Sequence, residues 1–264
     1  MKVTLITGAT SGIGEALTHL LATKKHNLLL VGRSEQKLKH LCKVLSDKEQ
    51  VSMHYIVADL CDPQAPKYIY DKSLEMNLSV DILVNNAGIG SSGEFLKNDL
   101  RSEIEILQVN NLAMVSLCHL FLPNMVKSKN GSIINVGSLA SFIPCPYMSV
   151  YAASKMFVLS FTEALSEECI PYDVHVMLFC PGLTTSNFMN TPANNNEWGK
   201  VLTNGASTQT PEEVALELVR AYEKRKSVYI SGRMNNFTTK AAAIIPNKII
   251  TKNFAKMKRK QMGL

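Results

Sequence analysis

The sequence predicts an α/β protein with a doubly wound, parallel sheet. Short apolar runs without polar alternation recur along the chain, as expected for strands that are buried on both faces. Segments with helical periodicity separate these runs, and this alternation favours right-handed crossovers between parallel strands. The seven expected strands cover residues 3–7, 28–31, 53–57, 82–84, 132–136, 174–179 and 228–230.

Composition and charge indicate an ordinary globular protein. Of the 264 residues, 46% are hydrophobic and 19% are charged, and no linker or repeat divides the chain, so we expect a single domain over residues 1–264. The net charge of +6 is modest, and part of it comes from basic residues crowded at 256–260. A nucleic-acid binder would show a broader basic stripe with interleaved aromatic residues, so no nucleic-acid partner is expected.

The cysteines and the N-terminus indicate a cytoplasmic protein without a metal. Six cysteines form no CxxC pair, and no histidine lies at metal-ligand spacing from any of them. Met1 and Lys2 lead directly into a strand that is too short for a signal peptide. We also expect no stretch that approaches the roughly 18 apolar residues of a membrane span.

The first expected strand ends in a glycine-rich loop, TGATSGIG, that favours binding of a pyrophosphate. Gly8, Gly12 and Gly14 lie between the strand and a helix. Glycine permits positive φ and close approach of a ligand, and the amides at a helix N-terminus attract anions. A tight turn without a ligand is the alternative. A literal GxGxxG pattern at 88–93 follows the fourth strand and opens no clear helix, so we do not assign it.

The residues after the second strand favour NADP(H) over NAD(H). NAD enzymes of this architecture have an acidic residue at this place, which bonds to the ribose hydroxyl. This chain instead has Gly32 followed by Arg33 and Ser34. The Arg33 guanidinium, with Ser34 or Lys37, could accept a 2′-phosphate. NAD(H) stays open as the second coenzyme, and a solvated arginine at a helix start is the structural alternative. Asp59, after the third strand, could bond the adenine amino group.

Tyr151 and Lys155 form the candidate proton-handling pair. Four residues apart on a helix, they share one face, and the ammonium can stabilise a phenolate. With a nicotinamide cation, this is expected to lower the tyrosine pKa from about 10 toward 7. Tyr68 and Tyr222 also have a lysine four residues later. Only Tyr151 follows a strand end that carries Ser138, so we choose this pair.

Ser138 and Asn110 are expected to support that pair. Ser138 could donate a hydrogen bond to the substrate oxygen. Asn110 lies in an otherwise apolar, helix-patterned segment at 100–126, where it could hold a water that links Lys155 to solvent. Asn111 competes for this role, and an ordinary buried contact with the backbone is the alternative.

Together these motifs resemble those of the short-chain dehydrogenase/reductase family over residues 2 to about 232. TGATSGIG, NNAG at 85–88, Asn110, Ser138, YAASK at 151–155 and PG at 181–182 occur in the family's order and at its usual distances. The stretch FIPCPYMSVYAASK is similar to bacterial broad carbonyl reductases and to hydroxysteroid and 3-ketoacyl-CoA reductases.

The resemblance implies a single Rossmann-like domain with a seven-stranded parallel sheet. It also implies a catalytic tetrad of Asn110, Ser138, Tyr151 and Lys155. Ser186 stands where the family usually has Thr, and it keeps the hydroxyl. The full set of expected cofactor contacts is Gly8, Thr10, Ser11, Gly12, Ile13, Gly14, Arg33, Asp59, Leu60, Asn86, Ala87, Gly88, Tyr151, Lys155, Pro181, Gly182, Thr184 and Ser186.

Two further segments are expected to shape the substrate site. Residues 142–148 and an insertion at 183–209, which carries Trp198, could wall an apolar pocket. The insertion is either a lid or a mobile surface loop. Within 142–148, Tyr147 is expected to line the pocket. Cys145 is either part of the wall or a reactive thiol, and we favour the wall.

The tail at 244–264 predicts a basic amphipathic helix, with Ile250, Phe254 and Met257 on its apolar face. It could contact an anionic membrane surface, although packing on its own domain or on a partner subunit is favoured.

We therefore expect an NADP(H)-dependent oxidoreductase that interconverts an apolar carbonyl compound and an alcohol. Tyr151 serves as the acid or base, and the chain forms a homo-oligomer, either a dimer or a tetramer. Reduction is the expected direction because cellular NADP pools are usually kept reduced. The alternatives are a non-catalytic NADP(H)-binding regulatory protein and a membrane-associated protein.

Overall fold

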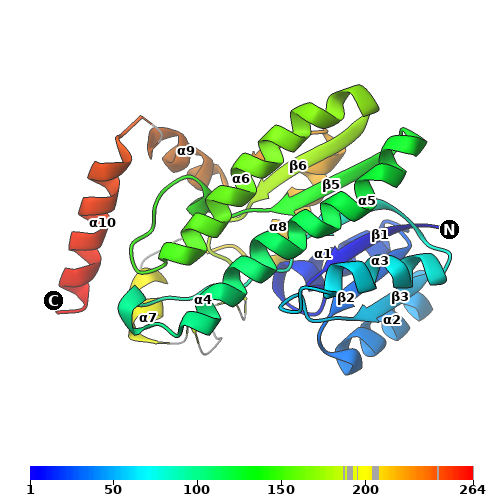
Figure 1. The fold of residues 1–264 in the computed structure, drawn as a ribbon, viewed down its shortest axis with the longest axis horizontal. Helices are drawn as coiled ribbons and strands as arrows, with labels where there is room; N and C mark the ends of the chain where they lie inside the picture. The colour runs from blue at the N-terminus through cyan, green and yellow to red at the C-terminus, as the bar shows by residue number, and fades with distance from the viewer. Residues whose placement is uncertain (187, 189–192, 195, 204–207, 243, 264) are drawn as a thin grey trace.

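Seven parallel strands form one sheet in the order β3-β2-β1-β4-β5-β6-β7, which confirms the doubly wound fold (Figure 1). The computed structural model describes the chain except residues 187, 189–192, 195, 204–207, 243 and 264. The strands are β1 (Lys2–Thr7), β2 (Leu28–Gly32), β3 (Met53–Val57), β4 (Ser79–Asn85), β5 (Gly131–Val136), β6 (Val174–Cys180) and β7 (Val228–Ile230).

All seven expected strands are present, and their bounds differ little from the sequence-based ones. The largest difference is β4, which begins at Ser79 rather than at residue 82. Asp81 interrupts the apolar run that we used to locate this strand, but its backbone still continues the sheet because Lys2 and Val3 pair with Ser79 and Val80. Because a polar residue lies near the start of β4, the apolar pattern did not reveal the first three residues of this strand.

Helices cover both faces of the sheet. Helices α1, α2 and α8 pack on one face and α3, α5 and α6 on the other. Successive residues of β1 serve the two cores, since Leu5 packs with α3 and α5 whereas Ile6 packs with α1 and α2. The helices are α1 (Gly12–Thr23), α2 (Glu35–Glu49), α3 (Ala65–Glu75), α4 (Leu100–Leu107), α5 (Met114–Ser128), α6 (Ser149–Cys169), α7 (Glu197–Thr203), α8 (Pro211–Glu223), α9 (Arg233–Ala242) and α10 (Asn247–Gln261).

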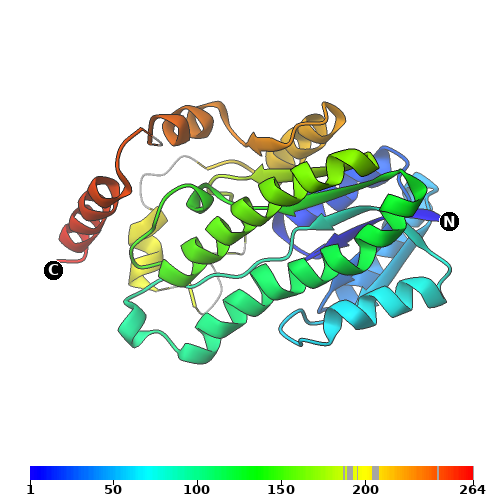
Figure 2. The same ribbon diagram turned by 45° about the horizontal axis from the view of Figure 1, so that its top comes forward.

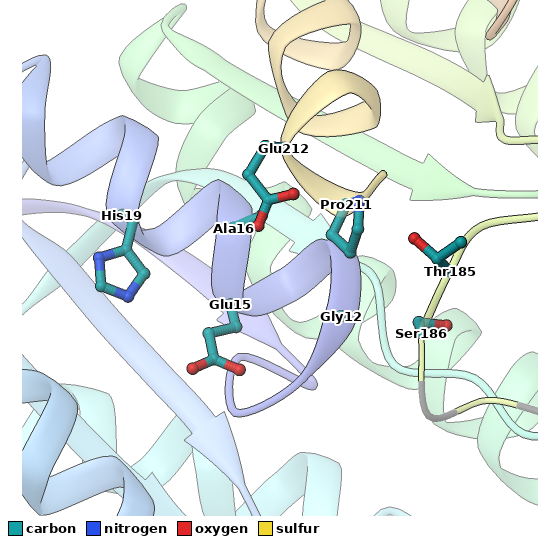
Figure 3. Close-up of a pocket in the computed structure, with 8 residues that line it drawn as sticks. All are labelled: Gly12, Glu15, Ala16, His19, Thr185, Ser186, Pro211 and Glu212. Carbon is teal, nitrogen blue, oxygen red and sulfur yellow. The ribbon is translucent and has the colours of Figure 1, made fainter. Parts of the chain in front are cut away.

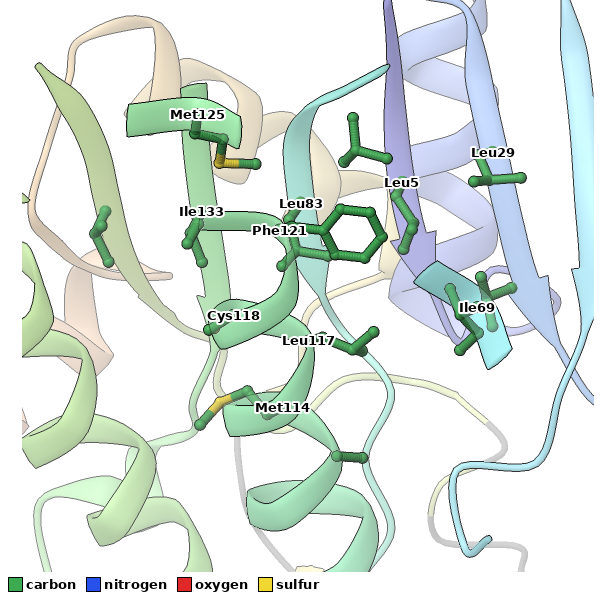
Figure 4. Packing of buried hydrophobic residues seen from close by; sticks show 14 of the residues in the cluster. Leu5, Leu29, Ile69, Leu83, Met114, Leu117, Cys118, Phe121, Met125 and Ile133 are labelled. Atoms are coloured by element: carbon green, nitrogen blue, oxygen red, sulfur yellow. The ribbon is translucent and has the colours of Figure 1, made fainter. Parts of the chain in front are cut away.

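The expected helical segment at 100–126 is present, but it contains a π-helical turn, η2 (Gln108–Ala113), between α4 and α5. Of the described helices, Leu100–Ser128 is long and apolar enough by length and composition to cross a membrane, with a mean hydropathy of 1.4. The expectation that no stretch approaches such a composition is therefore wrong. Its apolar side packs on the sheet through Leu117, Phe121 and Met125 (Figure 4), and a core helix of this kind passes the same test.

Helices α9 and α10 lie at the end of the molecule opposite the N-terminus, as both ribbon views show (Figures 1 and 2). Helix α10 contacts α7 rather than the sheet. The chain therefore ends on the side where the carboxyl ends of the strands meet.

Candidate active site

A cavity of about 840 Å³ lies beyond the carboxyl ends of β1, β2, β4, β5 and β6. This is the edge at which ligands bind in open α/β sheets. Four residues of the expected site, Gly14, Asp59, Leu60 and Asn110, are not in its wall. The expected site residues that line it are Gly8, Thr10, Ser11, Gly12, Ile13, Arg33, Asn86, Ala87, Gly88, Ser138, Tyr151, Lys155, Pro181, Gly182, Thr184 and Ser186.

The loop between β1 and α1 has the conformation that its glycines permit. Gly8 and Gly12 have φ values of 66° and 54°, which side chains rarely adopt. A Cβ at Gly14 would lie 2.2 Å from the Gly8 carbonyl oxygen. The backbone at Gly14 therefore passes close to that of Gly8, behind the cavity wall. Ser11, the N-cap of α1, makes no side-chain capping bond. The first amides of the helix therefore suit a bound anion.

Thr7 and Asn86 join this loop to the end of β4. The Thr7 hydroxyl accepts the backbone amide hydrogens of Asn86 and Ala87, each at 3.0 Å, and donates to Val84 O. The Asn86 amide donates to the carbonyl oxygen of Thr7 at 2.9 Å. Thr7 is buried and was not among the expected site residues. These bonds fix the NNAG turn against the glycine-rich loop.

One end of the cavity is basic. Thr10, Arg33, Ser34 and Lys37 line it together, and the first turn of α2 begins there because Ser34 accepts the amide hydrogen of Lys37. A guanidinium, an ammonium and two hydroxyls thus contribute to the lining of this cavity. This is the chemistry that a phosphate group on a ribose requires.

Asp59 and Leu60 lie outside the cavity wall. The Asp59 carboxylate accepts the amide hydrogen of Cys61 at 3.0 Å, as in an ordinary turn after a strand. Leu60 is buried in the core on the side of α3 and α5. The contact between Asp59 and adenine thus stays a prediction without support from the cavity.

Tyr151 and Lys155 lie together at the centre of the cavity, both on α6. The Lys155 ammonium is 5.9 Å from the centre of the Tyr151 ring and donates to Val136 O at 2.9 Å. Burial raises the pKa of Tyr151 to about 12, against a smaller opposite effect of its hydrogen bond with Ser138. Burial also lowers the pKa of Lys155 to about 8.

The expected lowering of the Tyr151 pKa includes the positive charge of a bound nicotinamide, so it stays a prediction for the complex with coenzyme. In the protein alone, desolvation by burial is the largest cause of the shifts in both pKa values. At neutral pH the tyrosine carries its proton. In this protonated state, Tyr151 can donate a proton.

Ser138 adjoins Tyr151 at the end of β5. It is the N-cap of the 3-10 turn η3 (Leu139–Ser141), where its oxygen accepts the Ala140 amide hydrogen at 3.2 Å. Its own backbone amide donates to Ser141 Oγ at 3.2 Å. These bonds fix the hydroxyl beside Tyr151, with which it forms a hydrogen bond.

Asn110 supports a loop of the cavity wall from outside the cavity. In the π-helical turn η2, its side chain exchanges hydrogen bonds with both backbone groups of Ile89, each at 2.9 Å, and donates to Ser154 Oγ. A Cβ at Gly88 would lie 3.3 Å from the Lys155 ammonium and 3.4 Å from Asn110 Oδ1, so the three residues are neighbours. The side chain thus positions the loop after β4, and the expected water link to Lys155 stays a prediction.

Some residues of the site carried no recognisable signal in the sequence. A Cβ at Gly90 would lie 2.9 Å from the Tyr151 ring, so this glycine makes room for the tyrosine. It belongs to the GxGxxG pattern that we set aside as a phosphate loop, and its role is close packing. Ser154 joins Asn110 to the Tyr151 backbone. Phe254, from α10, lines the same cavity although more than 80 residues separate it from α6.

The wall opposite the basic end is apolar. Cys145, Met148, Phe188, Leu202 and Phe254 line it, and the Phe188 ring lies 5.5 Å from that of Tyr151. Burial raises the pKa of Cys145 to about 11, so its thiol stays protonated at neutral pH and belongs to the wall.

Tyr147 does not line the cavity as expected, because its ring stacks on Trp198 at 3.7 Å. The two rings join residues 142–148 to α7.

In the part that the structure describes, the insertion at 183–209 is bonded at its neck and to the loop after β4. Thr184 pairs with Gln209 at its neck, and α7 lies within it. Asn196 donates to Ser92 O at 2.8 Å, so the insertion reaches the loop after β4. The role of the insertion as a lid stays a prediction.

A second cavity, of about 550 Å³, lies between α1 and the start of α8 (Figure 3). Glu15, His19 and Glu212 line it, and it shares Gly12 and Ser186 with the main cavity. Two carboxylates would repel a phosphate, so this cavity does not suit the anionic part of a dinucleotide.

Comparisons with known proteins agree with this geometry. The family model of the short chain dehydrogenases matches residues 2–198. The chain is 31% identical to dehydrogenase/reductase SDR family member 7B of Xenopus tropicalis, over 98% of this chain and 86% of that protein. It is 33% identical to the very-long-chain 3-oxoacyl-CoA reductase of Phaeosphaeria nodorum, over 69% of this chain and 54% of that protein.

Among solved structures, a short-chain dehydrogenase from Sphingobium yanoikuyae in complex with NADPH has a TM-score of 0.80. It is 28% identical, and the match covers 87% of each chain. The matched family model extends from β1, through the glycine-rich loop, to beyond α6. The chain belongs to the short-chain dehydrogenase/reductase family and is an oxidoreductase.

Proposed function

We propose that the chain reduces an apolar ketone or aldehyde to the alcohol, with NADPH as the hydride donor. One observation carries this proposal. A single cavity joins a basic end at Arg33 and Lys37, a centre at Ser138, Tyr151 and Lys155, and an apolar wall. A phosphorylated coenzyme and an apolar carbonyl compound are the two ligands that such a cavity fits side by side.

The residues present fit a dinucleotide cofactor. Gly8 and Gly12 have conformations that keep side chains out of the loop, and the first amides of α1 suit a pyrophosphate. Lys155, at the centre of the cavity, would hold the nicotinamide ribose, and Ser186 would meet the carboxamide. When bound, the nicotinamide supplies the hydride.

The chain's own residues would supply the proton. Ser138 would donate to the carbonyl oxygen and hold it beside Tyr151, whose phenol then gives its proton to the oxygen as negative charge develops there. The Lys155 ammonium would stabilise the resulting phenolate. Tyr151 is protonated at neutral pH, as donation of a proton to the carbonyl oxygen requires.

The experiment is an assay of NADPH oxidation by the purified chain with a panel of ketones and aldehydes of increasing apolar size. We expect turnover that rises with apolar bulk and little turnover of small polar sugars. NADPH binding without turnover of any carbonyl compound would instead favour the non-catalytic, regulatory alternative.

Replacing Arg33 by alanine is expected to weaken NADPH binding by about 10- to 100-fold while leaving NADH binding nearly unchanged. The reason is that Arg33 lies at the basic end, where only the 2′-phosphate distinguishes the two coenzymes. Fluorescence titration with each coenzyme measures this, with Lys43→Ala, on the following helix α2 but outside the cavity, as the control. Equal losses for NADPH and NADH would contradict the assignment.

We also propose that two copies associate through α4 and α6. Family membership favours an oligomer, and α4, the turn η2 and α6 expose large apolar side chains at Leu100, Ile104, Leu112 and Phe157. Leaving several large apolar side chains on one face is costly unless a partner covers it. In sedimentation velocity we expect a particle larger than the 29.2 kDa chain, reduced to a monomer by Ile104→Glu. A monomeric wild type would contradict this proposal.

A further inference from the structure

The positive charge of this protein is concentrated at its C-terminal end. Residues 1–232 hold 20 basic and 22 acidic residues, a net charge of −2, whereas residues 233–264 hold eight basic and no acidic residues. Helices α9 and α10 occupy most of this segment. The +6 of the whole chain thus arises from one region at one end of the molecule (Figure 1).

The same region exposes large apolar side chains. Phe237 on α9 is 70% exposed, and Ile244 in the turn between the two helices is 86% exposed. We call these residues and their exposed apolar neighbours, together with the exposed lysines of α10, the C-terminal surface. Its apolar members are Met234, Phe237, Ile244, Ile245, Ile249 and Met257. Large apolar side chains that are exposed among basic residues indicate a contact site rather than a surface that faces only water.

Two side chains on the opposite face fix the orientation of α10. Phe254 lines the active-site cavity, and the buried Lys258 ammonium donates to Val201 O on α7 at 2.7 Å. Lys258 also lies 5.6 Å from the Phe254 ring. With these residues held inward, Lys252 and Lys256 are exposed and directed away from the domain.

We propose that the C-terminal surface docks on an anionic lipid bilayer. Apolar side chains at an interfacial helix insert between the headgroups, while lysines beside them interact with anionic lipids, and binding requires both. A nucleic acid would use the charges but leave Phe237 and Ile244 in water. The helix that contacts the bilayer also lines the cavity through Phe254. As a consequence that rests on the proposed function, an apolar carbonyl substrate could reach the cavity from the membrane.

Flotation of the full chain with vesicles tests the proposal. We expect the wild type to float with phosphatidylcholine vesicles that contain phosphatidylserine, and to remain behind with phosphatidylcholine alone. Two basic residues near an anionic surface account for about a 30-fold change in binding. The double variant Lys252→Glu/Lys256→Glu should therefore bind at least about 30-fold more weakly. Ile244→Ser/Ile245→Ser should also weaken binding, and should do so at both low and high salt.

A matched control separates this surface from net charge. Lys39 and Lys43 have the same spacing on an exposed face of α2 at the other end of the molecule, and Lys39→Glu/Lys43→Glu changes the net charge by the same amount. We expect this variant to bind like the wild type, and an equal loss would overturn the proposal. Failure of the wild type to float with anionic vesicles would also overturn it, and would favour an acidic protein as the partner. Flotation requires no turnover, so this failure would leave the proposed reductase function untouched.

Discussion

Replacing Tyr151 by phenylalanine is expected to lower kcat for carbonyl reduction by about 10²- to 10⁴-fold, the usual contribution of a positioned general acid. The substitution removes only the hydroxyl, and the ring should keep its packing against Phe188 and Gly90. Affinity for NADPH should change little, because Lys155 and the glycine-rich loop are unchanged. The measurement is the rate of NADPH oxidation at saturating ketone, with coenzyme binding determined separately.

The chain offers a matched control for this variant. Tyr68 also has a lysine four residues later, and Lys72 lies 5.9 Å from its ring, the same distance as in the catalytic pair. Tyr68 is exposed on α3, far from the cavity, so Tyr68→Phe should retain full activity. Unchanged turnover in Tyr151→Phe would exclude the phenol as the proton donor.

Replacing Gly14 by alanine is expected to destabilise the fold by about 3 kcal/mol and to abolish NADPH binding at concentrations that saturate the wild type. A Cβ there would lie 2.2 Å from the Gly8 carbonyl oxygen and 2.5 Å from the Asn86 side-chain amide. Both neighbours are held by the bonds that join β1 to the NNAG turn, so the loop has to open. Urea unfolding and coenzyme titration measure the two effects.

The adjacent residue serves as the control. Glu15 is exposed in the same turn of α1, outside the main cavity, and Glu15→Ala adds no steric overlap. It should unfold at nearly the wild-type urea concentration and retain NADPH binding. If Gly14→Ala bound NADPH as tightly as the wild type, the loop would not be the coenzyme cradle inferred from its geometry.

Most of the fold could be predicted from the sequence because its strands are buried on both faces. Such strands appear as continuous apolar runs, and six of the seven began within one residue of the expected position. The π-helical turn at Gln108–Ala113 was not predicted, because the apolar pattern at 100–126 indicated only one continuous helical segment. Its cause is tertiary, since Asn110 and Asn111 both bond to partners outside the helix.

The candidate site could be predicted where its residues follow strand ends, since parallel strands bring those ends to one edge. Ser138, Tyr151 and Lys155 meet in the cavity for this reason. What depended on distant packing could not be predicted. Burial raises the pKa of Tyr151 in the protein alone, an effect that the spacing of Tyr151 and Lys155 does not reveal. Tyr147 stacks on Trp198 instead of facing the cavity.

The C-terminal helix illustrates the same limit. The sequence placed Ile250, Phe254 and Met257 on one apolar face, but Met257 is exposed and the charged Lys258 is buried instead. Lys258 lies inward because the carbonyl oxygen of Val201 accepts its hydrogen bond. Such a partner, more than 50 residues away in the chain, has no counterpart in the periodicity of the helix.

Transfer of deuterium from the nicotinamide carbon of labelled NADPH to an apolar ketone tests the central claim most directly. The account predicts an alcohol with one deuterium on its carbinol carbon in the wild type, and almost none of this product from Tyr151→Phe with coenzyme bound. Alcohol without the label, or equal labelled product from both proteins, would contradict hydride transfer coupled to a proton from Tyr151.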